Sequence, residues 1–127
     1  MLTGTAAGLV GAAWRLAAAS GPSTVHIVIR DSAFDASVLR VPSGRPVRFV
    51  VTNTDPIDHE LVIGDSAVQQ GHESGADSVH HSPGAVSVPA RSTAATSVRF
   101  DEPCGTLFGC HLPGHWLFGM RGRIEVG

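Results

Sequence analysis

The chain has 127 residues and a formal net charge of −2 at pH 7, and 43% of its residues are hydrophobic. This length fits one domain that can bury a hydrophobic core. The small negative charge gives no electrostatic footprint for nucleic acid, so we expect a single-domain protein that does not bind it.

The first residues differ in composition from the rest of the chain. Residues 1–20 are rich in Ala and Gly and carry one charge, Arg15, and Ala17-Ala18-Ala19 would serve as a small-residue cleavage site. No positive stretch precedes the apolar residues, and the uninterrupted run of about 18 apolar residues that spans a membrane is missing. We interpret residues 1–22 as a leader, with a signal segment, a membrane anchor, the stub of a longer N-terminus and a segment without a role as the alternatives, and residues 23–127 as the domain.

The domain reads as a series of short strands separated by Gly, Pro, Asn and Asp. Val25, Ile27 and Ile29 alternate with polar residues, which predicts a half-buried strand with His26 on its outer face. Further strands are predicted over residues 34–41, 47–53, 59–63, 86–88, 94–100, 106–110 and 121–126. About eight strands with little helix predict an all-β fold, a Greek-key antiparallel β-sandwich.

Residues 65–83 interrupt this series. They are polar, show no alternation and contain His72, His80 and His81. These three His could form an auxiliary metal site, on a short helix or a loop. We favour a solvated, mobile insertion, because a His-rich tract is only a compositional signal.

Near the C-terminus, Cys110, His115 and Met120 follow one another with four residues between each pair. His59 comes earlier, after a turn that ends a predicted strand. A thiolate, an imidazole and a thioether suit copper, and two His, one Cys and a distant Met form the ligand set of blue-copper electron-transfer sites. We therefore predict one type 1 copper ion with the metal ligands His59, Cys110, His115 and Met120.

The run of Cys110, Pro113-Gly114, His115 and Gly119-Met120, with His59 upstream, resembles the C-terminal copper loop of the cupredoxins. These are the small blue-copper proteins related to plastocyanin and azurin, and the resemblance covers nearly all of the domain. It implies that His115 is the ligand at the solvent edge, where the electron enters and leaves, and that Met120 is the axial ligand. It also implies an extracytoplasmic protein, whether periplasmic, secreted or membrane-anchored.

Two positions depart from familiar cupredoxins. Glu60 follows His59, where many members have an Asn that helps to hold the Cys sulfur, so the surroundings of the metal differ. His111 follows Cys110, whereas Gly109 stands where multicopper oxidases and copper nitrite reductases carry a His. Strand alternation places His111 on the face opposite Cys110, and we expect it to point toward solvent.

Apolar residues surround His115 in the sequence: Leu112, Pro113, Trp116, Leu117 and Phe118. We expect some of them in the core and others, Leu112 and Pro113 above all, at the surface. The exposed ones would form a docking face for a redox protein near His115.

The sequence thus predicts a monomeric carrier of single electrons that is not itself an enzyme. A first alternative is a copper carrier or buffer, helped by His72, His80 and His81. A second is a domain derived from a multicopper oxidase or nitrite reductase, which predicts trimers with His111 as a ligand between subunits. A third is a zinc-binding or metal-free interaction domain. Cys104 is interpreted as a small residue in a turn.

Overall fold

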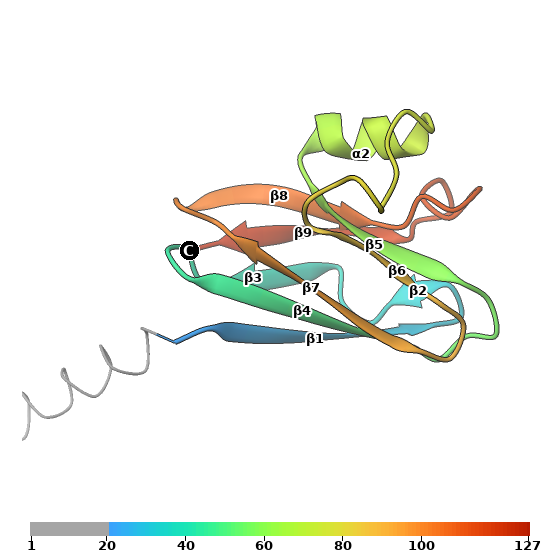
Figure 1. The fold of residues 1–127 in the computed structure, drawn as a ribbon, viewed down its shortest axis with the longest axis horizontal. Helices are drawn as coiled ribbons and strands as arrows, with labels where there is room; N and C mark the ends of the chain where they lie inside the picture. The colour runs from blue at the N-terminus through green and yellow to red at the C-terminus, as the bar shows by residue number, and fades with distance from the viewer. Residues whose placement is uncertain (1–20) are drawn as a thin grey trace, which may run out of the picture.

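Two facing β-sheets form the fold in the computed structural model, which describes residues 21–127 (Figure 1). The predicted leader lies outside the described residues except for Gly21 and Pro22. One sheet has the strand order β2 (Ala33–Phe34), β1 (Ser23–Arg30), β4 (Pro46–Asn53), β7 (Thr93–Arg99). The other has the order β3 (Val38–Val41), β9 (Arg121–Val126), β8 (Cys104–Gly109), β5 (His59–Gly64), β6 (Ala85–Val88). The β-sandwich prediction is confirmed.

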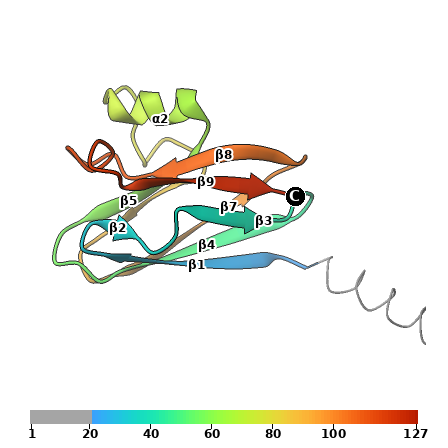
Figure 2. The same ribbon diagram turned by 180° about the vertical axis from the view of Figure 1, so that it is seen from behind.

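The segment predicted as one strand over residues 34–41 divides between the two sheets. The Asp35 N–H donates to the carbonyl of Val28 at 2.9 Å in the first sheet, and the Ser37 carbonyl accepts from Arg123 at 2.9 Å in the second. The chain therefore crosses the sandwich between these residues, which gives nine strands in the described part. The crossing also makes β3 parallel to β9, as Figure 2 shows, and β1 is parallel to β4.

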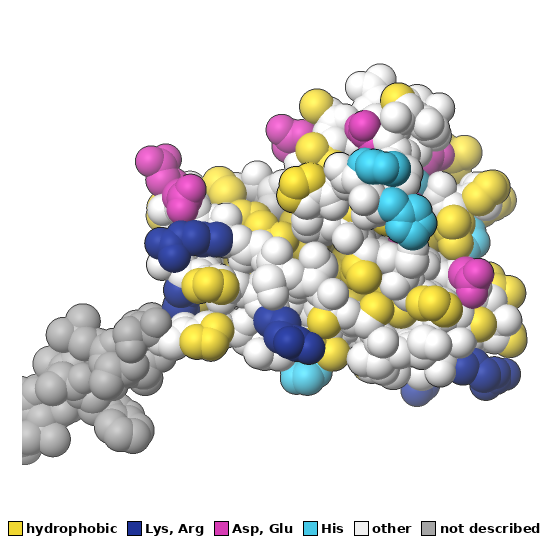
Figure 3. All heavy atoms as spheres, in the orientation of Figure 1, with side chains coloured by type: hydrophobic (Ala, Val, Ile, Leu, Met, Phe, Trp, Pro, Cys, Tyr) yellow, Lys and Arg dark blue, Asp and Glu magenta, His cyan; other side chains and the backbone are white. Residues whose placement is uncertain are grey.

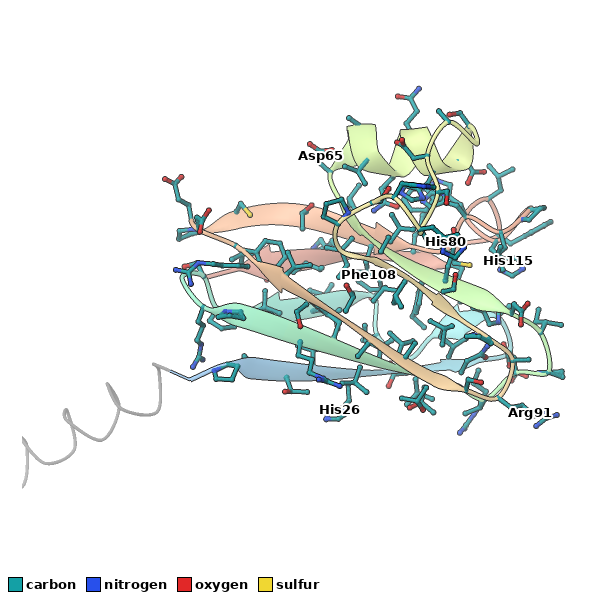
Figure 4. The ribbon with its side chains drawn as sticks, viewed as in Figure 1. His26, Asp65, His80, Arg91, Phe108 and His115 are labelled. Carbon is teal, nitrogen blue, oxygen red and sulfur yellow. The ribbon has the colours of Figure 1, made fainter. Side chains whose placement is uncertain are left out.

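The space between the sheets is filled by the alternating apolar residues of the strands. Ile27 and Ile29 are buried and His26 is exposed, as their alternation predicted. Phe108 points between the sheets (Figure 4) and meets Phe34 of the other sheet edge to face, with ring centroids 5.2 Å apart. Aromatic side chains in this geometry bury much apolar surface, so this contact ties the two sheets together.

One helix, α2 (Ser66–Glu73), lies on the outer face of the sheet that contains β5 and β8 (Figure 1). Asp65 caps it by accepting the Val68 N–H, a favourable N-cap interaction. Gln69 and His72 are buried beneath the helix. The prediction of a solvated, mobile insertion is therefore wrong for this part of residues 65–83. No helix within residues 21–127 is long and apolar enough to cross a membrane.

Removal of a central core ring tests this arrangement. We expect Phe49→Ala to lower the free energy of unfolding by about 3–5 kcal/mol, because the Phe49 side chain is fully buried and its loss leaves a cavity. The neighbouring exposed Arg48 is the control, and Arg48→Ala should change stability by less than about 0.5 kcal/mol. Urea denaturation measures the free energy of unfolding of both variants. Equal losses of stability would contradict the assignment of Phe49 to the buried face and Arg48 to the exposed face of β4.

Candidate metal centre

Three donor atoms from two distant segments meet at one end of the sandwich. Nδ1 of His115 lies 3.3 Å from Nδ1 of His59 and 3.3 Å from Sγ of Cys110. The three donor atoms all lie within 4.8 Å of one another. Among residues 21–127, no other group of three or more His, Cys, Asp and Glu converges in this way.

These distances fit a metal ion held by three ligands. Bonds of about 2.0 Å to nitrogen and about 2.3 Å to sulfur, as for zinc, put three donors in one plane roughly 3.5 Å apart. One thiolate and two imidazoles form the His₂Cys donor set on which copper is held trigonally in blue-copper sites. The residues therefore fit copper by both their spacing and their chemistry.

Cys110 directly follows β8 and is fully buried. Burial raises the pKa of its thiol to about 11, although the N–H groups of Leu112 and Glu60 bond to the sulfur and act in the opposite direction. A metal ion must therefore displace the thiol proton, and the two N–H groups are then in place to stabilise the thiolate.

His59 is the first residue of β5, and the turn before it is fixed by Asn53. The buried amide of Asn53 donates to the carbonyls of Ile57, Val88 and Pro89 at 2.9 to 3.1 Å. Its oxygen accepts the Asp55 N–H at 2.9 Å. The sequence predicted the turn from its Asn, Asp and Pro. It did not show that Asn53 connects the turn to the end of β6.

The outer ring nitrogen of His59 contacts a carboxylate. Nε2 lies 2.7 Å from Oδ2 of Asp55, and the carboxylate also accepts the N–H groups of Asp31 and Ser32. Burial acts to raise the pKa of Asp55, but the N–H of Ser32, the His59 side chain and the N–H of Asp31 together hold it below its ordinary value. The ionised carboxylate fixes the proton of His59 on Nε2 and leaves Nδ1 free to bind a metal.

His115 lies on the loop between β8 and β9, at the right-hand end of the sandwich in Figure 4. Gly114 precedes it with φ of +84°, a conformation that Gly adopts without a steric penalty. Burial, and the neighbouring His59, lower the pKa of His115. The ring is therefore neutral near pH 7, as a metal ligand must be.

Met120 is tied to both of its predicted partners through the backbone. Its N–H donates to the carbonyl of His115 at 3.0 Å, and its carbonyl accepts the N–H of Cys110 at 3.1 Å. Its side chain is 2% exposed and belongs to the core cluster that also contains Cys110. The loop thus closes on itself, with Met120 buried beside the site.

The side chain of His111 is buried, with 1% exposed, so the expectation that it points to solvent is wrong. Alternation does place it opposite Cys110, but α2 covers that face. Its ring nitrogens lie 2.6 Å from Glu73 and 2.6 Å from Gln69 of the helix, and its N–H donates to Glu60. Both nitrogens have partners within the fold, so neither is available as a ligand between subunits.

Trp116 holds the other side of His111. The two rings stack with centroids 4.7 Å apart, and Arg121 lies over the Trp116 ring at 5.0 Å. Gly109 makes this possible, because a Cβ there would lie 2.4 Å from the Trp116 ring. Gly109, which stands where the copper oxidases carry a His, therefore has a packing role here.

The surface next to His115 is apolar, through Pro113 as expected and also through Leu117 and Phe118. Leu117 is 76% exposed and Phe118 is 93% exposed, and Pro113 is also exposed. Leu112 is half-buried and packs against the core, so the prediction that it is exposed is wrong. Figure 3 shows hydrophobic side chains at the surface of this end of the molecule.

The remaining His and Cys residues lie apart from the centre. His72 is buried and bonds to Ser82 at 2.9 Å, while His80 and His81 are exposed. They do not form a convergent group within the described chain. Cys104 is exposed and unpaired at the start of β8, in a strand and not in the turn that was expected.

The comparison with protein families agrees with this donor set. The family model described as copper binding proteins, plastocyanin/azurin family, matches residues 23–127. The chain belongs to this family. It is a cupredoxin and copper is its cofactor, and His59, Cys110 and His115 are the converging residues that could hold the ion.

Two curated relatives of this cupredoxin share a name. The Copper-resistant cuproprotein CopI of Rubrivivax gelatinosus is 35% identical over 114 residues, which cover 86% of this chain and 69% of that protein. The protein of the same name from Vibrio cholerae is 31% identical over 115 residues, covering 85% and 68%.

Solved structures show the same fold. Auracyanin B matches with a TM-score of 0.69 and 24% identity over 83% of this chain and 88% of that chain. The auracyanin of Roseiflexus castenholzii matches with a TM-score of 0.72 and 19% identity over 85% and 99%.

Copper binding to this cupredoxin should weaken as the pH falls. The Cys110 thiol, with its pKa of about 11, must release one proton, whereas His115 is already neutral. The apparent dissociation constant should therefore rise about tenfold for each pH unit of acidification between about pH 9 and pH 7. Competition with a chelator of known affinity measures this dissociation constant at each pH, in a Cys104→Ser background that removes the exposed thiol. The control Cys110→Ser should lose most of this slope, and an equal slope in both proteins would contradict the role of the thiol.

Proposed function

We propose that this cupredoxin carries single electrons between redox partners, with copper bound by His59, Cys110 and His115 and with Met120 as the axial ligand. The observation that carries the proposal is the convergence of one buried thiol and two imidazoles, with His59 and Cys110 held by hydrogen bonds from outside the donor set and His115 held through its backbone. Bound there, copper would supply a one-electron couple between Cu(I) and Cu(II).

The protein holds these donors with little freedom to move. Asp55 fixes the ring of His59, the N–H groups of Glu60 and Leu112 bond to the sulfur of Cys110, and the Met120 N–H anchors the backbone of His115. A donor set that stays in place favours electron transfer, because little has to rearrange when the charge changes.

His115 offers the route between the centre and a partner. Its Nδ1 faces the other donors, its ring is half-buried, and the exposed Leu117 and Phe118 follow it in the loop. We propose that this apolar surface docks a redox protein, since exposed apolar patches rimmed by polar residues mark interaction sites. The protein would act as a monomer, outside the cytoplasm, without catalysing a reaction of its own.

The visible spectrum tests the copper–thiolate bond. In a Cys104→Ser background, one equivalent of Cu(II) should give an intense blue charge-transfer band that is absent from Cys110→Ser. The physical reason is that the band requires the thiolate of Cys110 as a ligand. A pale wild-type complex, or a blue band that survives Cys110→Ser, would overturn the electron-transfer proposal.

Electron exchange tests the docking surface. The double variant Leu117→Ser/Phe118→Ser should keep the blue band, because neither side chain is buried. Its rate of electron self-exchange should fall at least about tenfold, since two molecules must meet through this surface. A small inorganic oxidant needs no such surface and serves as the control, so its rate should change far less. Equal changes in the two rates would contradict docking through Leu117 and Phe118.

The second candidate function is copper carrying or buffering, which the relatives named copper-resistant cuproproteins support. A carrier must release copper to an acceptor, whereas an electron carrier must keep it through many redox cycles. Rapid loss of copper to a chelator together with irreversible voltammetry would favour the carrier. Slow copper loss with reversible voltammetry would favour electron transfer. The alternative of a domain derived from a multicopper oxidase or nitrite reductase requires a copper ion that His111 binds between subunits. The described chain does not support this alternative, because both ring nitrogens of His111 are bonded to α2.

A further inference from the structure

We propose that Asp55 is a positioning residue that makes His59 a stronger donor to Cu(II) than to Cu(I), and that it thereby holds the reduction potential of the centre down. This inference rests on the proposed copper site. It concerns a carboxylate that touches no donor atom of the site directly and acts through the far side of the His59 ring.

The surroundings of Asp55 show that it acts as an anion. The residue is 6% exposed, its oxygens accept the backbone N–H groups of Asp31 at 2.7 Å and Ser32 at 2.8 Å, and one of them also lies 2.7 Å from Nε2 of His59. A carboxyl group that accepts several hydrogen bonds and donates none is stabilised in its charged form. Asp55 therefore places a negative charge at one end of a ring whose other end faces the metal centre.

The turn between β1 and β2 directs two backbone N–H groups at this carboxylate. Asp31 and Ser32 have φ of +51° and +56°, in the left-handed region that non-glycine residues rarely adopt. Turns of this kind usually contain Asn or Gly, so the conformation costs free energy here. In return, two successive N–H groups point at Asp55. The turn holds the carboxylate against His59, which among residues 21–127 is the one ionisable side chain in hydrogen-bond contact with it.

The consequence for His59 follows from its two nitrogens. With its proton shared with Asp55, the ring has imidazolate character, and the lone pair on Nδ1 becomes a stronger donor. The more highly charged Cu(II) gains more from a stronger nitrogen donor than Cu(I), which is satisfied by soft sulfur ligands. Asp55 therefore stabilises the oxidised state selectively, and its loss should raise the potential.

The variant Asp55→Asn removes the charge and keeps the shape of the side chain. The amide has one acceptor oxygen, so its NH₂ group must face either His59 or the N–H groups of the turn. Asp58→Asn is the matched control, because Asp58 precedes His59 directly, is exposed and also accepts a backbone N–H, that of Ala90. Both variants lose one negative charge close to the centre, and only the first changes the partner of the His59 ring.

The first measurement needs no copper. Nitrogen-15 NMR of the imidazoles in the metal-free protein reports which ring nitrogen carries the proton. We expect His59 in the wild type and in Asp58→Asn to be protonated on Nε2 alone, and Asp55→Asn to show a mixture of the two tautomers. Protonation of His59 on Nδ1 in the wild type, or an unchanged tautomer in Asp55→Asn, would overturn the proposal.

The second measurement is the reduction potential together with the affinities for Cu(I) and Cu(II). We expect Asp55→Asn to lose about 10- to 100-fold more affinity for Cu(II) than for Cu(I). Because tenfold corresponds to about 59 mV for one electron, the potential should rise by about 60–120 mV. Asp58→Asn should shift it far less. Equal losses for both oxidation states would show a merely structural role and would overturn the proposal.

Two controls separate this inference from the proposed function. A wild-type protein without a blue band would refute the electron-transfer function, whereas the NMR experiment would still decide whether Asp55 sets the state of His59. Should Asp55→Asn fail to fold, Asp55→Glu keeps the charge but moves it along the side chain. We then expect Nε2 protonation to persist and the potential to stay near the wild-type value, and a rise of about 60–120 mV with Nε2 protonation intact would overturn the proposal.

Discussion

The metal centre depends on the pairing of β5 with β8. These strands are antiparallel neighbours, with Val62 opposite Gly109, so the start of β5 and the end of β8 lie at the same end of one sheet. His59 opens the first strand and Cys110 directly follows the second. A one-residue shift of this pairing would separate the thiol from the imidazole, because it turns every side chain of the shifted strand to the opposite face.

Hydrogen bonds outside the donor set then fix how each donor is presented. Asn53 closes the turn before His59, Asp55 holds the far side of its ring, and Glu60 connects the two strands. Glu60 donates its N–H to the sulfur of Cys110, and its carboxylate accepts the N–H of His111. Glu60, which departs from familiar cupredoxins, thus still contacts the sulfur through its backbone, while its side chain binds the backbone N–H of His111.

Helix α2 makes this cupredoxin a three-layered structure on one side. Its inner face buries Gln69 and His72, and it supplies the partners of His111. The His111 imidazole stacks on the Trp116 ring, which packs against Gly109, so these three residues form a layer beneath the helix. The copper loop is therefore anchored on the sandwich core at Met120 and on the helix at His111.

The sequence alone determined the strand series and the alternation of Ile27 and Ile29, and it predicted the three residues His59, Cys110 and His115 that the fold brings together, because these depend on local periodicity and on ligand chemistry. It predicted the opposite faces of Cys110 and His111 correctly. It could not show what covers the outer face, since α2 has a weak sequence pattern and is stabilised by tertiary contacts. The tertiary structure also decided that Asp55 is the partner of His59, because the N–H groups that hold Asp55 come from a turn about 23 residues earlier in the chain, and no local pattern encodes such a contact.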